Sequence, residues 1–336
     1  MSLVMSQNPN MVREFENIIF SGVNGPLGYA LKNLVAIDDR FMSFSSSQCD
    51  LRDKEVTKTF FEDQLRGFNP SNVAYIHLAA VSGGAKFSAE NSASVFADNV
   101  LMALNAISTC CELGIKRVIM TLSTSCYSES VELPIESQLH AGPISATDYA
   151  YSYAKRMQEV LMRSFNQQYG MDITSVLVNG IIGGKMNFNP ESRILPASLI
   201  CEIFKAKEEN AQVSISFDPR VRREYTWSKD LAQAILWCLN FQERNSLLNI
   251  GNSRPVSIPE LVSLIAKSVG LPSKLISLVE VTATGRLLQK TVNESFLRVS
   301  DFQYSPLIDA VADAVFWYIE NLDKVTPSET LQIHSI

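Results

Sequence analysis

A tyrosine and a lysine four residues apart, Tyr151 and Lys155, give this 336-residue chain its clearest indication of chemistry. In a helix, that spacing puts both side chains on one face. A phenol with a pKa near 10 donates a proton poorly at neutral pH. An ammonium group one turn away stabilises the phenolate and lowers that pKa. The pair therefore predicts protonation of the alkoxide that forms when a hydride is transferred to a ketone.

A run of hydroxyl side chains precedes this pair in the sequence. Ser123, Thr124 and Ser125 follow the apolar segment Arg117 to Leu122, which predicts a strand. The carboxyl edge of a parallel sheet is where ligands bind in such folds, and a hydroxyl there can hydrogen-bond a sugar oxygen. We take Thr124 as the first choice for a third catalytic group and Ser125 as the second.

The chain contains a second tyrosine and lysine at the same spacing, Tyr225 and Lys229. Ser228 between them is a typical N-cap residue, and a helix is expected to begin at Lys229. The two side chains would then lie on either side of the helix start rather than on one face. We therefore exclude this pair from the predicted site.

Three glycines spaced three apart, Gly22, Gly25 and Gly28, lie between a predicted strand and a predicted helix. A backbone without side chains can turn sharply and approach a pyrophosphate, which the free N–H groups and dipole of the helix N-terminus then bind. The turn predicts a dinucleotide site. The residues of this turn that we expect to bind the cofactor are Gly22, Asn24, Gly25, Leu27 and Gly28.

The end of the second predicted strand bears on the choice of cofactor. An NAD site usually places an acidic side chain there, about 20 residues after the glycines, to hold the ribose. Here the segment is Ser45-Ser46-Ser47, whose hydroxyls could accept a 2′-phosphate. NADP is therefore favoured, with NAD left open. Asp50 and Leu51 follow, where such folds contact the adenine.

Strands and helices alternate through the first half of the chain, which predicts an α/β fold of the Rossmann type with a doubly wound parallel sheet. We expect a dinucleotide-binding domain over residues 12–180. Residues 181–325 should form a smaller substrate-binding lobe with segments that return to the sheet. Residues 1–11 and 326–336 are expected to be flexible. The predicted strands are Asn17–Phe20, Phe41–Phe44, Val73–Leu78, Arg117–Leu122 and Ile173–Val178, and the helices are Leu27–Leu34, Lys54–Leu65, Phe96–Leu113 and Asp148–Tyr169.

Composition excludes several classes of function. The net charge is −6 and both signs are dispersed, which is unlike a nucleic-acid-binding surface. The six cysteines and three histidines form no metal-ligand pattern, so we expect no metal site and reduced thiols in a cytoplasmic protein. The N-terminal segment lacks the basic stretch and following apolar run of a signal peptide, so we expect none. We expect no membrane span, because no apolar run approaches the roughly 20 residues that one requires.

With these motifs in order, the chain resembles the extended short-chain dehydrogenases/reductases, and most of all the GDP-L-fucose synthase family. That family epimerises a GDP-linked 4-keto-6-deoxymannose at C3 and C5 and then reduces C4. The resemblance extends from about Asn17 to about Tyr318. It is carried by His77-Leu78-Ala79-Ala80 with Gly83-Gly84, Thr124-Ser125-Cys126, Tyr151 to Lys155, Ser164 to Gly170, Asn187 to Ser192 and Arg223-Glu224-Tyr225.

The resemblance implies roles for individual residues. Thr124, Tyr151 and Lys155 would form the reductive triad, and Cys126 would stand where the family has the base of epimerisation. Leu78, Ala79, Ala80 and Asn179 would line the cofactor. The substrate would be held by Ser125, Asn187, Arg223 and Lys290, and Arg193, which departs from the family, could bind substrate or a cofactor phosphate. The family also implies a homodimer, in which the long helices Phe96–Leu113 and Asp148–Tyr169 pair with their copies.

Three departures from the family matter. Arg193 stands where the family has the histidine acid of epimerisation, and an arginine stays protonated and cannot exchange protons as histidine does. Cys201 replaces a substrate-binding arginine, and Ser216 replaces an aromatic residue that stacks on the base. We therefore expect an NADP-dependent reductase of a nucleotide-linked, GDP-type 4-keto-6-deoxy sugar. Epimerisation at one centre is the most that we expect, and the sugar and nucleotide stay open.

Two other classes of function remain as alternatives. One is an NAD(P)-dependent epimerase or dehydratase of another nucleotide sugar. A dehydratase usually needs an acid/base carboxylate beside the catalytic hydroxyl, and Ser125-Cys126 provides none. The other is a non-catalytic protein that binds a nucleotide sugar, which the intact set of Thr124, Tyr151 and Lys155 disfavours.

Overall fold

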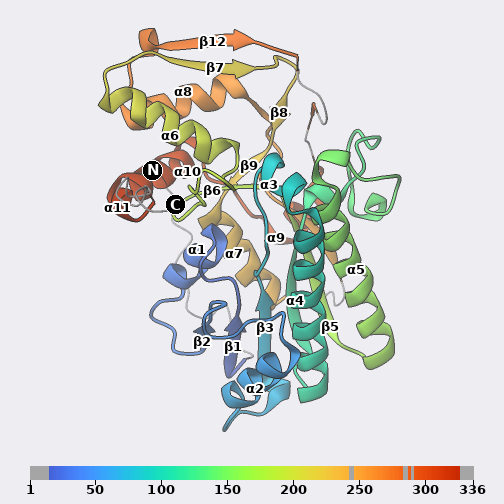
Figure 1. Cartoon of the computed structure of the whole chain (residues 1–336). Helices are drawn as coiled ribbons and strands as arrows, with labels where there is room; N and C mark the ends of the chain where they lie inside the picture. The colour runs from blue at the N-terminus through green and yellow to red at the C-terminus, as the bar shows by residue number, and fades with distance from the viewer. Residues whose placement is uncertain (1–14, 242–245, 283–286, 289–290, 326–336) are drawn as a thin grey trace, which may run out of the picture.

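A six-stranded sheet forms the base of the molecule in the computed structural model, which describes residues 15–241, 246–282, 287–288 and 291–325. All its strand pairs are parallel, and the order is β10-β5-β4-β3-β1-β2 (Figure 1). This confirms the predicted α/β fold of the Rossmann type. The strands are β1 (Asn17–Phe20), β2 (Phe41–Ser43), β3 (Val73–His77), β4 (Arg117–Ser123), β5 (Asp172–Val178) and β10 (Leu247–Ile250).

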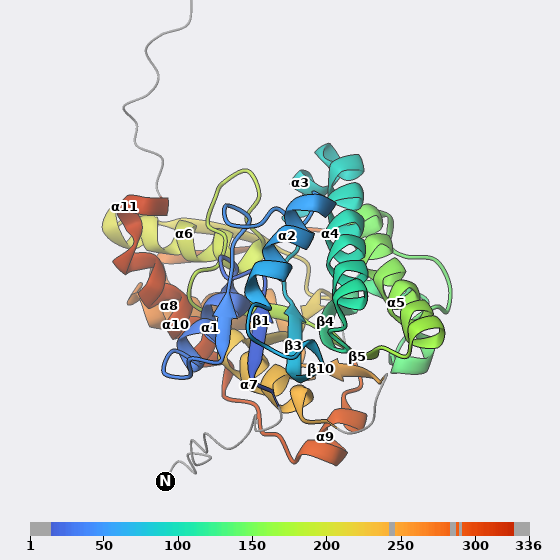
Figure 2. The same ribbon diagram turned by 90° about the horizontal axis from the view of Figure 1, so that it is seen from below.

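Helices cover both faces of this sheet because its strands are apolar on both sides, as the fully buried β1 and β3 illustrate. One face packs against α2 (Lys54–Gln64), α4 (Ser92–Leu113) and α5 (Tyr149–Tyr169). The other packs against α1 (Pro26–Leu34), α7 (Ser228–Leu239) and α9 (Glu294–Ser300). Seen from below, the sheet lies between these two layers (Figure 2).

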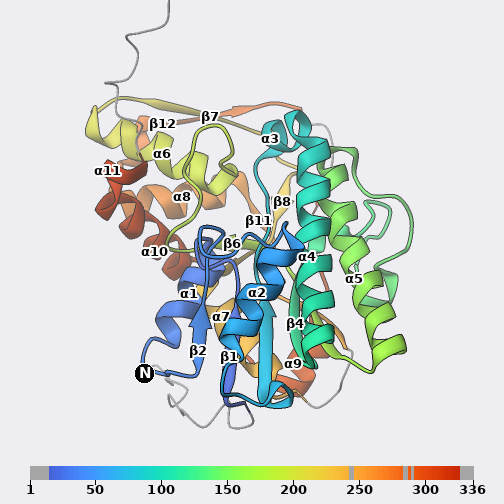
Figure 3. The ribbon, with the colours of Figure 1, turned by 60° about the horizontal axis from the view of Figure 1, so that its bottom comes forward.

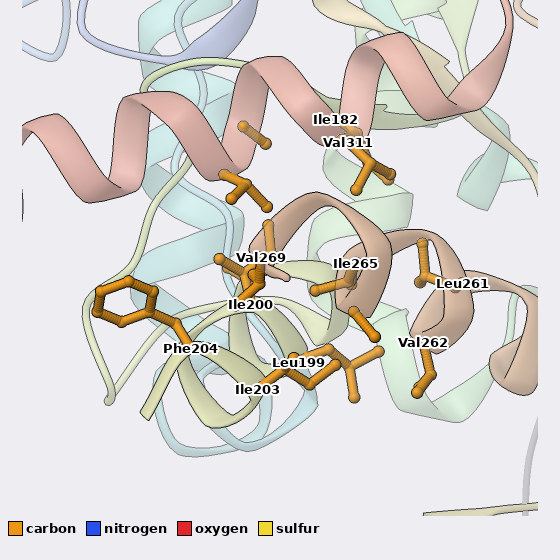
Figure 4. Close-up of a cluster of buried hydrophobic side chains, with 14 of the residues drawn as sticks. Ile182, Leu199, Ile200, Ile203, Phe204, Leu261, Val262, Ile265, Val269 and Val311 are labelled. Carbon is orange, nitrogen blue, oxygen red and sulfur yellow. The ribbon is translucent and has the colours of Figure 1, made fainter. Parts of the chain in front are cut away.

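Segments beyond residue 181 divide between two places. α7, α9 and β10 return to the sheet, where β10 pairs with β5. The rest forms a second lobe with its own core between α6 (Leu195–Glu208), α8 (Ile258–Val269) and α10 (Leu307–Glu320). Ile200, Ile203, Leu261, Ile265 and Val311 meet in this core (Figure 4). The parallel pair β7 (Val213–Phe217) and β12 (Ile276–Glu280) covers its outer side.

Short elements connect the lobes. They are α3 (Ala85–Glu90), β6 (Gly180–Ile182), β8 (Arg222–Arg223), β9 (Tyr225–Trp227), β11 (Val256–Ser257) and α11 (Leu322–Val325). α3 is missing from the sequence-based prediction because its six residues are too few for a helical apolar period. α4 begins four residues before the predicted Phe96, and β2 ends one residue before the predicted Phe44.

α4 also corrects the expectation that no segment approaches a membrane span. Among the described residues, Ser92–Leu113 has the length and apolar composition of such a span, and half of its most apolar stretch is buried inside the protein. The helix packs against the sheet and lies beside α5 (Figure 3). A core helix that is covered on one side has the same length and apolar composition as a membrane span, which explains the resemblance of α4 to one.

Candidate active site

A cavity of about 400 Å³ opens where the strands β1, β3, β4 and β5 end, between the sheet and the second lobe. This is the edge at which open α/β sheets bind their ligands. The glycine-rich turn, the ends of β3 and β4, the first turns of α5 and the loop after β6 all contribute to its wall. Most of the predicted site residues meet here.

The glycine-rich turn is shaped for close approach of a ligand. Gly22 has φ +78°, and a Cβ on it would lie 2.6 Å from the carbonyl carbon of Leu78. A Cβ on Gly28 would overlap the carbonyl of Gly22, so α1 packs closely against the turn. Pro26 occupies the first turn of α1, where its missing N–H costs no hydrogen bond. Gly25, Pro26, Leu27 and Gly28 line the cavity, so the N-terminus of α1, which favours an anion such as a pyrophosphate, lies beside it.

The predicted catalytic pair lies one helical turn apart on α5, and both side chains line the cavity. Lys155 Nζ donates a hydrogen bond to the carbonyl oxygen of Thr121, 3.0 Å away. Burial lowers the pKa of Lys155 to about 8. Burial raises the pKa of Tyr151 well above its usual value, opposite to the lowering that we expected from Lys155, so the phenol is protonated. The arrangement can supply a proton to an oxygen bound beside Tyr151.

Ser123, rather than Thr124, is the hydroxyl that faces Tyr151. The Ser123 side chain hydrogen-bonds Tyr151, lowers its pKa, and lines the cavity. β4 continues to Ser123, and a short 3₁₀ turn, Thr124–Cys126, then directs Thr124 into the interior, where it is 1% exposed. Thr124 itself does not line the cavity, and its predicted catalytic role stays a prediction. Ser125 does line it.

A chain of hydroxyl groups joins Ser152, Ser125 and Ser123. Ser152 Oγ donates to Ser125 Oγ at 2.8 Å, and Ser125 Oγ donates to Ser123 Oγ at 3.0 Å. The backbone N–H of Ser125 also donates to Ser123 Oγ, at 3.2 Å. With both contacts accepted by its oxygen, the Ser123 hydroxyl keeps its own proton for Tyr151 or for a substrate oxygen.

Cys126 and Arg193 occupy other surroundings. Cys126 is fully buried, and its thiol donates to the carbonyl oxygen of Ser152 at 3.5 Å. Arg193 Nε donates to Ser198 Oγ at 3.2 Å, on α6, and its guanidinium also contacts Cys201. Neither side chain lines the cavity, although Ser192 and Ile194 on either side of Arg193 do. Cys126 nevertheless interacts electrostatically with Tyr151 and Lys155, so its thiol lies near the catalytic pair, whereas Arg193 is directed to α6.

The remaining predicted residues divide into two groups. Those that line the cavity are Gly22, Gly25, Leu27, Gly28, Leu78, Ala80, Asn179 and Asn187. Those that do not are Asn24, Asp50, Leu51, Ala79 and Arg223. Lys290 lies outside the described residues.

The second group has clear alternative contacts. Asp50 pairs with Arg52 at 2.7 Å, and Leu51 is buried in the core beneath α2. The backbone N–H of Ala79 donates to Ser21 Oγ, which ties the end of β3 to the turn. Arg223 Nη1 donates to the carbonyl oxygen of Leu287 at 3.1 Å.

Asp148 is a site residue that sequence reasoning placed differently. It precedes the first residue of α5, as expected of an N-cap, but its side chain makes no capping hydrogen bond. It lines the cavity instead and raises the pKa of Tyr151 by its charge. Its position three residues before Tyr151 was the available signal. Of the residues that line this cavity in the described part of the chain, only Asp148, Tyr151 and Lys155 are ionisable.

Comparison with known proteins agrees with this geometry. The model of the NAD dependent epimerase/dehydratase family matches residues 28–251. The GDP-L-fucose synthase of Dictyostelium discoideum is 28% identical over 91% of this chain and 96% of its own length. The resemblance to GDP-L-fucose synthases found in the sequence is thereby confirmed.

Solved structures give the same result. A GDP-L-fucose synthetase from Naegleria fowleri, solved with bound NADP, superposes with a TM-score of 0.81. It is 29% identical, over 93% of this chain and 95% of its own. A GDP-mannoheptose C4 reductase from Campylobacter jejuni shares the fold at a TM-score of 0.79 and 22% identity, over 91% of this chain and 99% of its own.

Proposed function

This chain belongs to the NAD dependent epimerase/dehydratase family, and we propose that it is a reductase that uses NADPH to reduce a nucleotide-linked 4-keto-6-deoxy sugar. GDP is the proposed nucleotide, since the relatives that match nearly the whole chain are GDP-L-fucose synthases. We further propose that reduction proceeds without epimerisation at both C3 and C5.

The residues of the cavity fit a dinucleotide cofactor. A Cβ on Gly22 would collide with the backbone of Leu78, and one on Gly28 with the carbonyl of Gly22, so these glycines let the turn pack closely against β3 and α1 beside the cavity. No acidic side chain follows β2 before Asp50, whose carboxylate is paired with Arg52. Ser45 and Ser47 offer hydroxyl groups there, which favours NADP over NAD. NADPH, when bound, supplies the hydride.

The protein supplies the proton. Tyr151 donates its phenolic proton to the sugar oxygen that becomes an alkoxide, and Ser123 hydrogen-bonds the same oxygen. Lys155, one turn along α5, stabilises the phenolate that remains on Tyr151. Asn179, which donates to the carbonyl oxygen of Asn252 at 3.0 Å, is held at the end of β5 to line the cofactor side of the cavity.

The observation that carries the reductase assignment is the position of Cys126 and Arg193. Epimerisation beside a ketone needs a base to remove a carbon-bound proton and an acid to return one. The thiol of Cys126 is buried and donates to the carbonyl oxygen of Ser152, while Arg193, directed to Ser198, stays protonated and cannot exchange protons as a histidine does. The side chain that faces the cavity next to Ser123 is Ser125, an alcohol that removes such a proton poorly. Among the described residues that line the cavity, Asp148 is the one carboxylate, so it would serve any epimerisation at a single centre.

The assignment is tested by NADPH oxidation with a series of substrates. We expect GDP-4-keto-6-deoxymannose or a GDP-4-keto heptose to be reduced, and the UDP- and dTDP-linked counterparts to react more slowly. Oxidation with a UDP- or dTDP-linked sugar alone would contradict GDP as the nucleotide. No oxidation with any 4-keto sugar, despite tight NADPH binding, would favour the non-catalytic alternative.

We also propose a homodimer formed through α4 and α5. These helices lie side by side on the outside of the sheet (Figures 1 and 3). Their outer surface exposes Leu101 and Leu104 on α4 and Tyr149, Met157 and Val160 on α5, each at least 40% accessible. An apolar surface of this kind is typical of an interface. Light scattering should give twice the 37.3 kDa chain mass, and L104E/V160E should halve it.

A further inference from the structure

A second cavity, of about 490 Å³, lies on the other side of the glycine-rich turn. Asn24, Gly25 and Pro26 form one wall, and the loop Lys185 to Pro190 with Lys324 forms another. It shares Gly25, Pro26, Met186 and Asn187 with the active-site cavity, so the two are adjacent. Its side chains have no part in the proton transfer described above.

Lys185 is held in an unusual backbone conformation at this cavity. Its φ is +59°, one of three positive values among the described residues other than glycine. The preceding residue is fixed, because Gly184 N–H donates to Asp313 Oδ2 at 2.8 Å. Asp313 is itself held by Trp227 Nε1 at 3.0 Å and Lys229 Nζ at 2.8 Å. Residues held in sparsely populated backbone regions cluster at ligand-binding sites.

The charge of Lys185 is only partly compensated. Its Nζ donates to Asn24 Oδ1 at 3.1 Å and lies 5.7 Å from the centre of the Tyr29 ring. Within the described residues it forms no ion pair, in contrast to Lys229, which pairs with Asp313. Burial and the neighbouring ammonium of Lys32 lower the pKa of Lys185. An anion bound beside the Lys185 ammonium would offset the cost of its burial and its repulsion by Lys32.

We propose that Lys185 binds a phosphate group of the dinucleotide cofactor, reaching it across the glycine-rich turn from the second lobe. Asn24, whose carboxamide oxygen accepts from Lys185, belongs to that turn, so the ammonium already lies beside the predicted pyrophosphate site. The phosphate is that of the pyrophosphate or of the adenosine 2′-position, which share the chemistry that an ammonium recognises. The inference rests on the proposed function only for the class of cofactor.

The test is the dissociation constant of NADPH, measured by fluorescence without any sugar substrate. We expect K185Q to weaken binding roughly tenfold, as loss of one charge-assisted hydrogen bond predicts. K185R should stay within about threefold of the parent, and the salt dependence of binding should be smaller in K185Q. K205Q is the matched control, since Lys205 on α6 is exposed and pairs with Glu209 away from both cavities.

The two sources of phosphate are separated by repeating the titration with NADH. An equal loss for NADPH and NADH assigns Lys185 to the pyrophosphate, and a loss for NADPH alone assigns it to the 2′-phosphate. A K185Q protein that melts like the parent and binds both cofactors within twofold of it would overturn the inference. Tight NADPH binding that K185Q weakens, in a protein that reduces no sugar, would refute the proposed function and leave this role of Lys185 intact.

Discussion

Ser152 Oγ lies 2.8 Å from Ser125 Oγ and donates a hydrogen bond to it, which links the first turn of α5 to the end of β4. Ser125 passes this polarity to Ser123, whose hydroxyl faces Tyr151. Hydrogen bonds aligned in one direction polarise one another. Tyr151, the proton donor, and Ser123, its hydrogen-bond partner, therefore belong to one hydrogen-bond network that extends to Ser152.

Replacement of the proton donor tests the centre of this network. Y151F should lower kcat by roughly 10²- to 10⁴-fold, the usual contribution of a positioned general acid. NADPH binding should change little, since the phenyl ring fills the same space. Steady-state kinetics and a cofactor titration of the same protein check both statements. A fully active Y151F would remove Tyr151 from the mechanism.

The choice between Ser123 and Thr124 can be decided by a pair of variants. S123A removes the hydroxyl that faces Tyr151, so kcat should fall roughly 10- to 100-fold by analogy with loss of one oxyanion donor. T124A removes the buried hydroxyl and should stay within about threefold of the parent. The comparison is one of kcat with the same sugar substrate. T124A with low kcat beside a normal S123A would restore the original assignment to Thr124.

Ser152 should influence catalysis without touching the substrate. S152A removes the donor to Ser125, and loss of one hydrogen bond predicts a decrease in kcat of roughly 2- to 10-fold. The alkaline limb of the kcat–pH profile should also move upward, because Ser123 would stabilise the Tyr151 phenolate less well. S164A is the control, since Ser164 on the same helix bonds only the carbonyl oxygen of Val160. An unchanged profile in S152A would show that Ser152 is structural only.

Lys155 should leave a signature in the pH dependence of stability of the cofactor-free protein. Burial lowers its pKa to about 8 from the usual 10.5 of a lysine, so between these values the unfolded chain binds the proton and the folded chain does not. The free energy of unfolding therefore rises with pH from about 8 to about 10.5 because of this group. Chemical denaturation of the parent and K155M across that window should show the rise in the parent only. Parallel curves would contradict it.

The sheet and its helices could be predicted from the sequence because apolar periodicity fixes them. β1 begins and ends where the pattern of Asn17–Phe20 places it, and Tyr151 and Lys155 share a face because α5 is a long regular helix. The third hydroxyl could not be predicted in the same way. Whether Ser123 or Thr124 faces the cavity depends on the residue at which β4 gives way to a 3₁₀ turn, and a shift of one residue reverses the side-chain direction.

The side-chain positions of the second lobe are harder still to predict from the sequence. Arg193 was predicted to bind substrate from its position in the chain, but its direction is set by tertiary contacts with Ser198 and Cys201 on α6. Lys185 carries no local motif that marks it. It reaches Asn24 because Asp313 on α10, more than a hundred residues away in sequence, fixes the turn before it.

The central claim, reduction without epimerisation at both centres, is tested most directly by turnover in deuterated water. The protein is incubated with NADPH and GDP-4-keto-6-deoxymannose, and the product is analysed by mass spectrometry and NMR for deuterium bonded to carbon. With Cys126 buried and Arg193 turned to Ser198, we predict NADPH oxidation with deuterium at neither C3 nor C5, or at one of them through Asp148. Deuterium at both C3 and C5 would contradict the claim.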